Sequence, residues 1–184
     1  MQHENQDFPS ELLSETDNIR LQNFTNKAKK LEFLTARLCA SAVTGRHLKF
    51  DCKANEPPLV ERGYLSIAHT TGYAAAAYHT HKKVGIDIEL SDRLVKENVQ
   101  KRYAAENELK LIQNSGDALK LWCAKEAVFK AGHIHGLDFK KNIYIEWNDL
   151  NEGTGYIHYE ATCQVFSIRQ FSVENLLIVY AVEK

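Results

Sequence analysis

Residues 84–89 read Val-Gly-Ile-Asp-Ile-Glu, and residues 122–130 read Trp-Cys-Ala-Lys-Glu-Ala-Val-Phe-Lys. These two stretches decide the fold prediction, because the first alternates with the period of a strand and the second has the spacing of a helix. Every second side chain of a strand projects from the same face, so Asp87 and Glu89 are expected side by side. Together the two stretches offer three carboxylates and two lysines for one site.

The helix predicted over 118–130 carries two charges inside its apolar stripe. Glu126 and Lys130 fall on that stripe, and burying either ion is costly unless it finds a partner. One interpretation is a mutual ion pair four residues apart, with Asp87 and Glu89 solvated on the wet face of a strand. The other is that Glu126 joins the two strand carboxylates around a divalent cation while Lys130 meets an anion.

Size and composition indicate an ordinary folded globular protein. The chain has 184 residues, 44% of them hydrophobic, a net charge of -1 and a pI near 6.7. This balance excludes the broad basic field that drives binding to nucleic acids or membrane surfaces. Residues 1–7 are polar, and no apolar run approaches the roughly 18 residues of a membrane span, so we expect a cytoplasmic protein with no membrane partner. The cysteines lack C-x-x-C spacing and predict reduced thiols: Cys39, Cys52, Cys123 and Cys163.

The order of elements predicts an α+β fold with two similar halves, 1–84 and 85–184, each a helical part followed by antiparallel strands. Residues 1–20 are expected to be a loose lead-in. In the first half we predict a helix with its clearest part at 29–40 and a meander of strands at 48–50, 64–68, 73–78 and 83–89. In the second half we predict helices at 98–113 and 118–130 and strands at 143–147, 155–160, 162–169 and 176–182.

Two histidine pairs could suggest a transition-metal site. His79 and His81, like His133 and His135, are two residues apart, so both members of a pair could reach one ion from a strand. No cysteine or carboxylate stands at a matching spacing, which favours exposed turns instead.

Three motifs in order resemble those of the 4'-phosphopantetheinyl transferase superfamily. They are Ser-Ile-Ala-His-Thr at 66–70, Val-Gly-Ile-Asp-Ile-Glu at 84–89 and W-x-x-K-E-A-x-x-K at 122–130. Weaker agreements at 32–37 and 103–108 extend the resemblance over roughly residues 18–140. The pattern is most similar to the larger single-chain type, in which two halves related by a pseudo-twofold axis mimic a dimer, and this implies a monomer.

The resemblance implies transfer of the 4'-phosphopantetheine group of coenzyme A to a serine of an apo acyl or peptidyl carrier protein, with release of adenosine 3',5'-bisphosphate. Asp87, Glu89 and Glu126 would hold Mg²⁺ on the pyrophosphate, since Mg²⁺ prefers oxygen ligands. Glu126 would also be the catalytic base, directly or through water, and Lys130 would be catalytic by neutralising phosphate charge. Lys125 would orient a phosphate of coenzyme A or pair structurally.

On the nucleotide side, the resemblance places His69 near a phosphate of coenzyme A. Two departures weaken that side: Glu56 stands where the family often has a lysine, and Ala68 stands where it usually has a hydroxyl. We expect Arg37 and Lys53 to supply the missing positive charge. These departures keep open a second hypothesis, a non-catalytic relative that binds coenzyme A or a carrier protein. The carboxylates alone would also permit a magnesium-dependent phosphodiester hydrolase.

Overall fold

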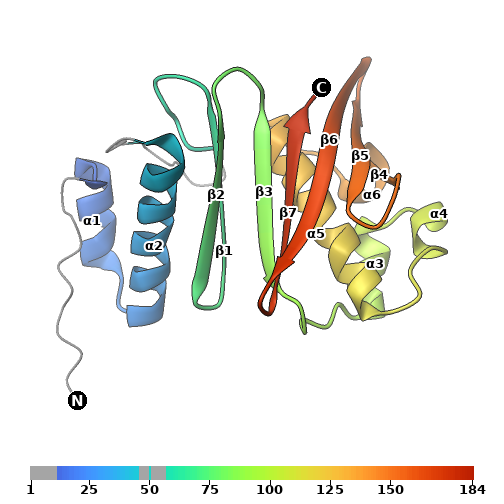
Figure 1. Ribbon diagram of the computed structural model, residues 1–184, viewed down its shortest axis with the longest axis horizontal. Coiled ribbons are helices and arrows are strands. Elements are labelled where there is room, and N and C mark those ends of the chain that lie inside the picture. Colours follow the sequence, from blue (N-terminus) through green and yellow to red (C-terminus); the bar gives the residue numbers. More distant parts are fainter. Residues whose placement is uncertain (1–11, 46–49, 51–56) are drawn as a thin grey trace.

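The computed structural model describes residues 12–45, 50 and 57–184. Its first part contains two helices and a hairpin: α1 (Glu15–Asn23), α2 (Lys27–Thr44), β1 (Tyr64–Thr70) and β2 (Tyr73–His79). The strands pair antiparallel, and α2 packs against the hairpin on the side away from the rest of the molecule (Figure 1). A small apolar cluster of Ala40, Phe50 and Leu65 fills the space between helix and hairpin.

The helix α1 corrects the expectation of a loose lead-in up to residue 20. Ser14 caps this helix, because its side chain accepts from the Asp17 backbone N–H at 3.1 Å and Asp17 bonds back to the Ser14 backbone. The Asp17 carboxylate is also buried against the guanidinium of Arg37 on α2. A polar sequence thus becomes ordered through a cap and a buried ion pair, neither of which hydrophobic periodicity detects.

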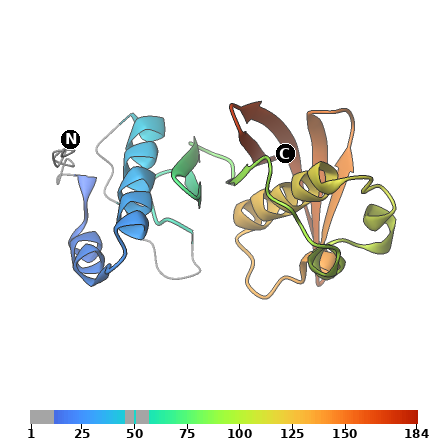
Figure 2. The ribbon, with the colours of Figure 1, turned by 90° about the horizontal axis from the view of Figure 1, so that it is seen from below.

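The second part of the chain forms a five-stranded antiparallel sheet in the order β3-β7-β6-β5-β4. Its strands are β3 (Val84–Leu90), β4 (Ile143–Trp147), β5 (Glu152–Tyr159), β6 (Thr162–Val173) and β7 (Leu176–Glu183). Helix α5 (Ser115–Gly132) crosses one face of this sheet (Figure 2) and buries the main core against it. Strand β3 pairs with β7. This pairing corrects the expectation that the strands of residues 64–89 form one meander.

The helix predicted over 98–113 is wrong as a single element. The chain forms α3 (Glu97–Tyr103) and α4 (Glu106–Leu109), separated by extended backbone at Ala104 and Ala105. The carboxylate of Glu108 accepts from the Ala105 N–H at 2.8 Å, which starts a new helix there. A further short helix, α6 (Phe139–Asn142), precedes β4 and was not expected.

The predicted α+β class is confirmed, with antiparallel sheets and helices in both parts of the chain. The strand predicted at 48–50 lies almost wholly outside the described residues. Cys39, Cys123 and Cys163 are free thiols, and Cys52 lies outside that range. Among the helices of the described residues, none combines the length and apolar character needed to cross a bilayer.

Candidate active site

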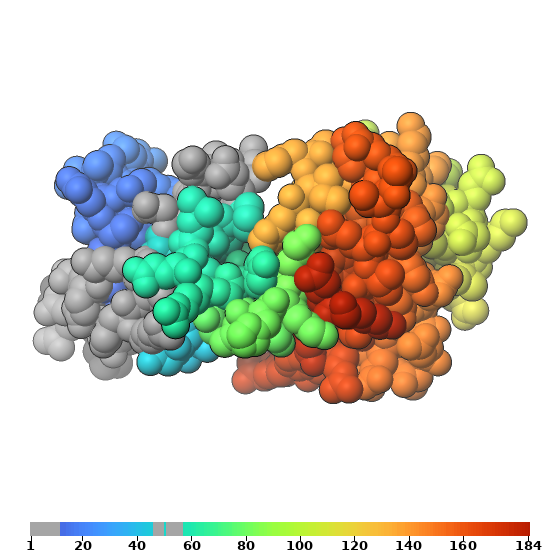
Figure 3. Space-filling view, turned by 90° about the horizontal axis from the view of Figure 1, so that it is seen from above, coloured from blue at the N-terminus to red at the C-terminus, as the bar shows by residue number. Residues whose placement is uncertain are grey.

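The candidate site lies where strand β1 of the first part meets strand β3 of the second. The two strands share no hydrogen-bonded ladder and belong to different sheets. They are joined by side chains instead: the Ile86 N–H donates to Ser66 Oγ at 3.1 Å, and Thr70 Oγ1 donates to Glu89 Oε2 at 3.1 Å. Figure 3 shows the teal segment of the first part beside the bright green and red segments of the second part. The first and second sequence motifs are therefore neighbours in space.

Asp87 on β3 contacts Lys130 on α5, which joins the second and third motifs. Lys130 Nζ donates to Asp87 Oδ1 at 2.7 Å and to the carbonyl oxygen of Ile86 at 3.0 Å. Gly85 permits this approach, because a Cβ there would overlap the carbonyl oxygen of Ala127 on α5. The glycine of the motif thus lets α5 lie directly on β3, with Lys130 paired across to Asp87 rather than along the helix to Glu126.

Glu126 lies close to this pair without an ion pair of its own among the described residues. Burial raises the pKa of its carboxyl group; the positive charge of Lys130 opposes that shift, and the Asp87 carboxylate adds to it. The Cys123 thiol is fully buried one helical turn earlier, and burial followed by the neighbouring Asp87 carboxylate raises its pKa. Cys123 is therefore an uncharged thiol packed beside Asp87.

Glu89, the third predicted magnesium ligand, is turned toward a cation. It forms an ion pair with Arg93, four residues further along the chain, and accepts from Thr70. Across residues 12–45, 50 and 57–184, no three His, Cys, Asp or Glu side chains are grouped closely enough to hold a metal ion. The structure therefore brings Asp87 and Glu126 together and leaves Glu89 engaged elsewhere.

One atom of the site is nevertheless suited to a cation. Asp87 Oδ2 is buried and has no hydrogen-bond partner among the described residues. Lys130 already balances the charge of this carboxylate through Oδ1, so Oδ2 is left with unused acceptor capacity, which is costly in a buried position. Because its neighbours include the Glu126 carboxylate, the residues present fit a divalent cation with oxygen ligands.

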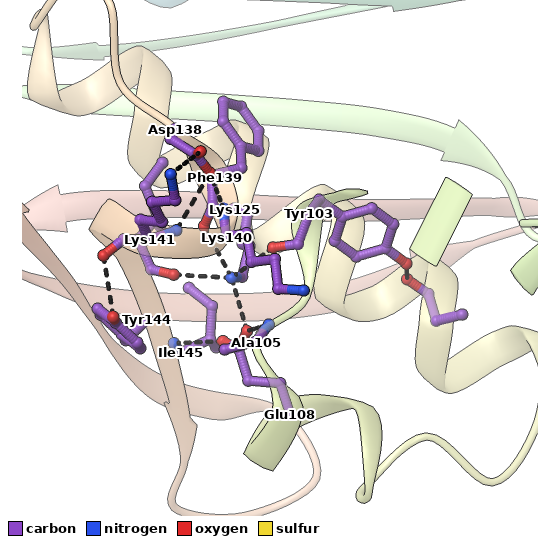
Figure 4. Close-up of polar contacts among 12 residues, drawn as sticks. Tyr103, Ala105, Glu108, Lys125, Asp138, Phe139, Lys140, Lys141, Tyr144 and Ile145 are labelled. Atoms are coloured by element: carbon purple, nitrogen blue, oxygen red, sulfur yellow. Dashed lines mark hydrogen bonds and ion pairs between the residues drawn. The ribbon is translucent and has the colours of Figure 1, made fainter. Parts of the chain in front are cut away.

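Lys125 lines neither the cavity beside Lys130 nor the cavity around His69. Its side chain is fully buried, and burial lowers the pKa of its ammonium while Glu108 opposes that shift. The ammonium contacts are Glu108 Oε2 at 2.6 Å and the carbonyl oxygens of Ile143, Tyr103 and Phe139 at 2.7, 2.8 and 3.0 Å (Figure 4). These contacts agree with the structural pairing that the sequence left open.

His69 is exposed on β1 and lines a cavity of about 430 Å³. Three cations and one carboxylate also line this cavity, namely Arg20, Lys29, Arg37 and Glu32, so positive charge is in excess there. Arg37 contributes less than its sequence position suggests, because it is 4% exposed and its guanidinium is bound to Asp17, with Nε to Oδ2 at 2.8 Å. Lys53 and Glu56 lie outside the described residues.

Ala68 has a packing role. It is 3% exposed and packs in a cluster with Ile86, Ile88 and Leu176. Alternation along β1 turns it to the face opposite His69, so a hydroxyl at this position would meet aliphatic side chains. A hydroxyl at position 68 would therefore not line the His69 cavity, and its absence removes no contact from that cavity.

A second cavity, of about 230 Å³, opens beside Lys130. Its walls are mostly apolar and include Leu65 and Phe129, with His133 as a polar member. Pro58 and Ile67 line this cavity and the His69 cavity alike, so the two are adjacent along β1.

Comparison with known proteins identifies the family. The family model described as "4'-phosphopantetheinyl transferase superfamily" matches residues 83–180. The chain belongs to this superfamily. The resemblance predicted from the sequence is thereby confirmed at the family level, and the match includes the four residues around the Asp87–Lys130 contact: Asp87, Glu89, Glu126 and Lys130.

A similar solved structure is the holo-[acyl-carrier-protein] synthase (AcpS) of Thermotoga maritima. It is 20% identical to this chain, with a TM-score of 0.43, and the match covers 55% of this chain and 62% of that one. The chain thus spans less than two thirds of that protein's length. A search of curated proteins found no match.

Sequence reasoning on this member of the 4'-phosphopantetheinyl transferase superfamily missed three residues near the site. Arg93 pairs with Glu89, and its four-residue spacing from Glu89 was the available signal. Lys29 and Arg20 line the His69 cavity, although nothing in their own sequence context links them to the histidine motif. Their position depends on how α1 and α2 pack against β1, which only the tertiary structure reveals.

Proposed function

We propose that this protein transfers the 4'-phosphopantetheine group from coenzyme A to a serine hydroxyl of an apo acyl or peptidyl carrier protein. The observation that carries the proposal is the buried Asp87, which contacts Lys130 with one oxygen and leaves the other without a partner beside Glu126. Such a site can hold a cation and a phosphate together. Membership of the superfamily supports the same reaction.

Asp87, Glu89 and Glu126 are the residues proposed to hold Mg²⁺. When bound, the ion would supply positive charge that neutralises the pyrophosphate of coenzyme A. Glu89 can bind the metal once its ion pair with Arg93 is broken. Arg93 is exposed, so its side chain can turn toward solvent.

Lys130 and Glu126 are proposed to act directly on the reacting groups. The serine oxygen attacks the phosphorus atom that bears the pantetheine arm, a new O–P bond forms, and the pyrophosphate P–O bond breaks to release adenosine 3',5'-bisphosphate. Glu126 accepts the serine proton at its carboxylate, directly or through water. Lys130 stabilises the charge that grows on the phosphate oxygens.

The cavity around His69 is proposed to hold the nucleotide end of coenzyme A. His69, Lys29 and Arg20 line it and can address phosphate oxygens, while Arg37 supports the wall through Asp17. Lys53 is kept as a further proposed phosphate ligand. We also propose that the protein acts as a cytoplasmic monomer, in keeping with both parts of the site lying in one chain.

A second candidate, a non-catalytic relative that binds coenzyme A or a carrier protein, is favoured by one contact. The ion pair between Arg93 and Glu89 occupies a carboxylate that the metal would need. If Arg93 holds this position in the presence of magnesium and coenzyme A, binding proceeds without transfer.

The deciding experiment combines the protein with coenzyme A, Mg²⁺ and a panel of apo carrier proteins. Intact-mass spectrometry follows the carrier, and chromatography follows adenosine 3',5'-bisphosphate. Carrier modification with equal nucleotide release is the expected result. Coenzyme A binding without product supports the non-catalytic relative, and nucleotide release without carrier modification supports a hydrolase.

Two substitutions test the assigned residues in that assay. Asp87→Ala and Glu126→Gln are each expected to lower the transfer rate by about 100-fold or more, because each removes charge stabilisation or proton transfer at the reacting atoms. Glu146→Gln is the matched control, since Glu146 is exposed on β4 and far from the contact between α5 and β3. Wild-type rates in a folded Asp87→Ala or Glu126→Gln variant would remove that residue from the mechanism.

A further inference from the structure

Two residues that the proposed reaction does not use, Glu108 and Lys125, form one buried ion pair. Glu108 ends the 103–108 stretch, and Lys125 belongs to the motif of α5; the side chains of this pair are 4% and 0% exposed. Neither group reaches the His69 cavity or the cavity beside Lys130. The pair therefore contributes nothing by direct contact with a ligand in either cavity.

The contacts of the pair are hydrogen bonds and an ion pair, which depend on direction as well as distance. An ammonium has three N–H donors, and Lys125 is surrounded by four acceptors on four segments of chain: the end of α3, α4, α6 and the start of β4 (Figure 4). Glu108 uses its other contacts on the main chain, accepting from Ala105 at 2.8 Å and from Ile145 at 3.2 Å. Apolar packing tolerates small rotations of a helix about its axis. This set of hydrogen bonds instead fixes both the rotation of α5 about its axis and its position along that axis.

The opposite side of α5 is fixed as well, by its close approach to Gly85 on β3. Glu126 follows Lys125 by one residue and therefore lies about 100° further around the helix. Fixing the direction of the Lys125 side chain thus also fixes the direction in which Glu126 projects. Side-chain ends lie about 5–6 Å from a helix axis, so a rotation of about 10° would move the Glu126 carboxylate by about 1 Å. A displacement of that size is enough to impair a reaction that depends on alignment.

We infer that Lys125 and Glu108 are positioning residues, which hold the rotation of α5 so that Glu126 and Lys130 meet Asp87. This inference rests on the proposed transferase function. A pair that merely stabilised the fold would affect the melting temperature without changing the rate of the folded enzyme.

The test is the double variant Lys125→Met/Glu108→Gln, which leaves no unpaired buried charge. Rates are normalised to the folded fraction measured by circular dichroism, well below the melting temperature. We expect kcat for carrier modification to fall by about 10- to 100-fold while KM for coenzyme A is unchanged. Lys120→Met is the matched control on the same helix, because Lys120 bonds to the Leu150 carbonyl and touches neither member of the pair; its kcat should equal that of the wild type.

A crystal structure of the double variant gives a readout that does not depend on activity. We expect Glu126 and Lys130 to be displaced and the contact of Lys130 with Asp87 to be lost. Unchanged kcat, or unchanged positions of these side chains, would overturn the inference. Failure of the wild-type protein to modify any carrier would refute the proposed function instead, and the crystal structure would still decide the role of the pair.

If the double variant does not fold, Glu108→Asp serves in its place. It keeps a negative charge opposite Lys125 and the three carbonyl contacts of Lys125 while shortening the side chain, so the fold is expected to persist. The inference predicts a smaller decrease in kcat with KM unchanged. A wild-type kcat in this variant would contradict it.

Discussion

The three charged residues between positions 125 and 130 occupy different electrostatic environments, although they lie on one helix. Lys125 uses all its donors on interior acceptors, and Lys130 reaches Asp87 while remaining 27% exposed. Glu126 has no ion pair among the described residues, and burial raises the pKa of its carboxyl group. Of the three, Lys130 and Glu126 therefore retain a polar group for a ligand, which is consistent with the roles proposed for them and with a positioning role for Lys125.

A residue-scale prediction concerns His133, which follows α5 in the left-handed region with φ 54°. Its Nε2 is buried without a partner among the described residues, and burial, then Lys83, lowers its pKa while Glu183 opposes the shift. Lys130 and His135 line the same cavity. As the pH falls, the imidazole of His133 is protonated in the unfolded chain near its ordinary pKa of about 6.5, before it is protonated in the folded protein. The free energy of unfolding should therefore fall as the pH drops from about 7 through the lowered pKa of the folded state.

His133→Asn is the matched variant, because asparagine tolerates the left-handed conformation and does not titrate. Urea unfolding at a series of pH values should show a smaller loss of stability in the variant than in the wild type between about pH 7 and pH 5. Equal pH dependence of the two proteins would show that His133 is not the group responsible.

At the scale of elements, periodicity predicted most of what local sequence controls. The strands around 64–70 and 84–90 and the helix over 115–132 were anticipated because their alternation or helical spacing extends over many residues. The break between α3 and α4 was not, because it depends on two polar contacts that periodicity does not detect: Glu108 accepts from the Ala105 N–H at the start of α4, and Lys125 donates to the Tyr103 carbonyl at the end of α3. The pairing of β3 with β7 joins opposite ends of the second part, and no turn signal between neighbours could reveal it.

Gly85→Ala is the element-scale prediction, since the helix α5 lies against β3 at this residue. The added methyl group would meet the Ala127 carbonyl and the Ala131 backbone nitrogen, which cannot move without shifting α5. We expect a loss of about 1–3 kcal/mol in the free energy of unfolding, measured by urea denaturation. Gly116→Ala, in the first turn of α5, meets only the Asn114 side chain and should change stability by no more than about 1 kcal/mol. Equal stabilities for the two variants would refute the close contact.

At the scale of the whole molecule, the site belongs to neither part alone. His69 and its cavity come from α1, α2 and β1, whereas Asp87, Glu126 and Lys130 come from β3 and α5. The two cavities share Pro58 and Ile67 as lining residues, so a ligand long enough to enter both would run along β1 and touch both parts. Sequence order placed the motifs correctly but could not reveal this shared wall, because it arises from packing between strands that do not pair.

The corresponding prediction is that adenosine 3',5'-bisphosphate stabilises the whole chain. A ligand at about 100 times its dissociation constant adds about 2.7 kcal/mol to the free energy of unfolding. For a domain of this size that amounts to a rise of about 5–10 °C in melting temperature, measurable by differential scanning fluorimetry. His69→Ala and Lys29→Ala should each reduce the shift, because their side chains line the cavity, while Lys82→Ala, exposed in the turn between β2 and β3, should leave it intact. A full shift in both cavity variants would place the nucleotide elsewhere. A shift that disappears in the Lys82 variant would indicate non-specific charge attraction, because Lys82 does not line the cavity.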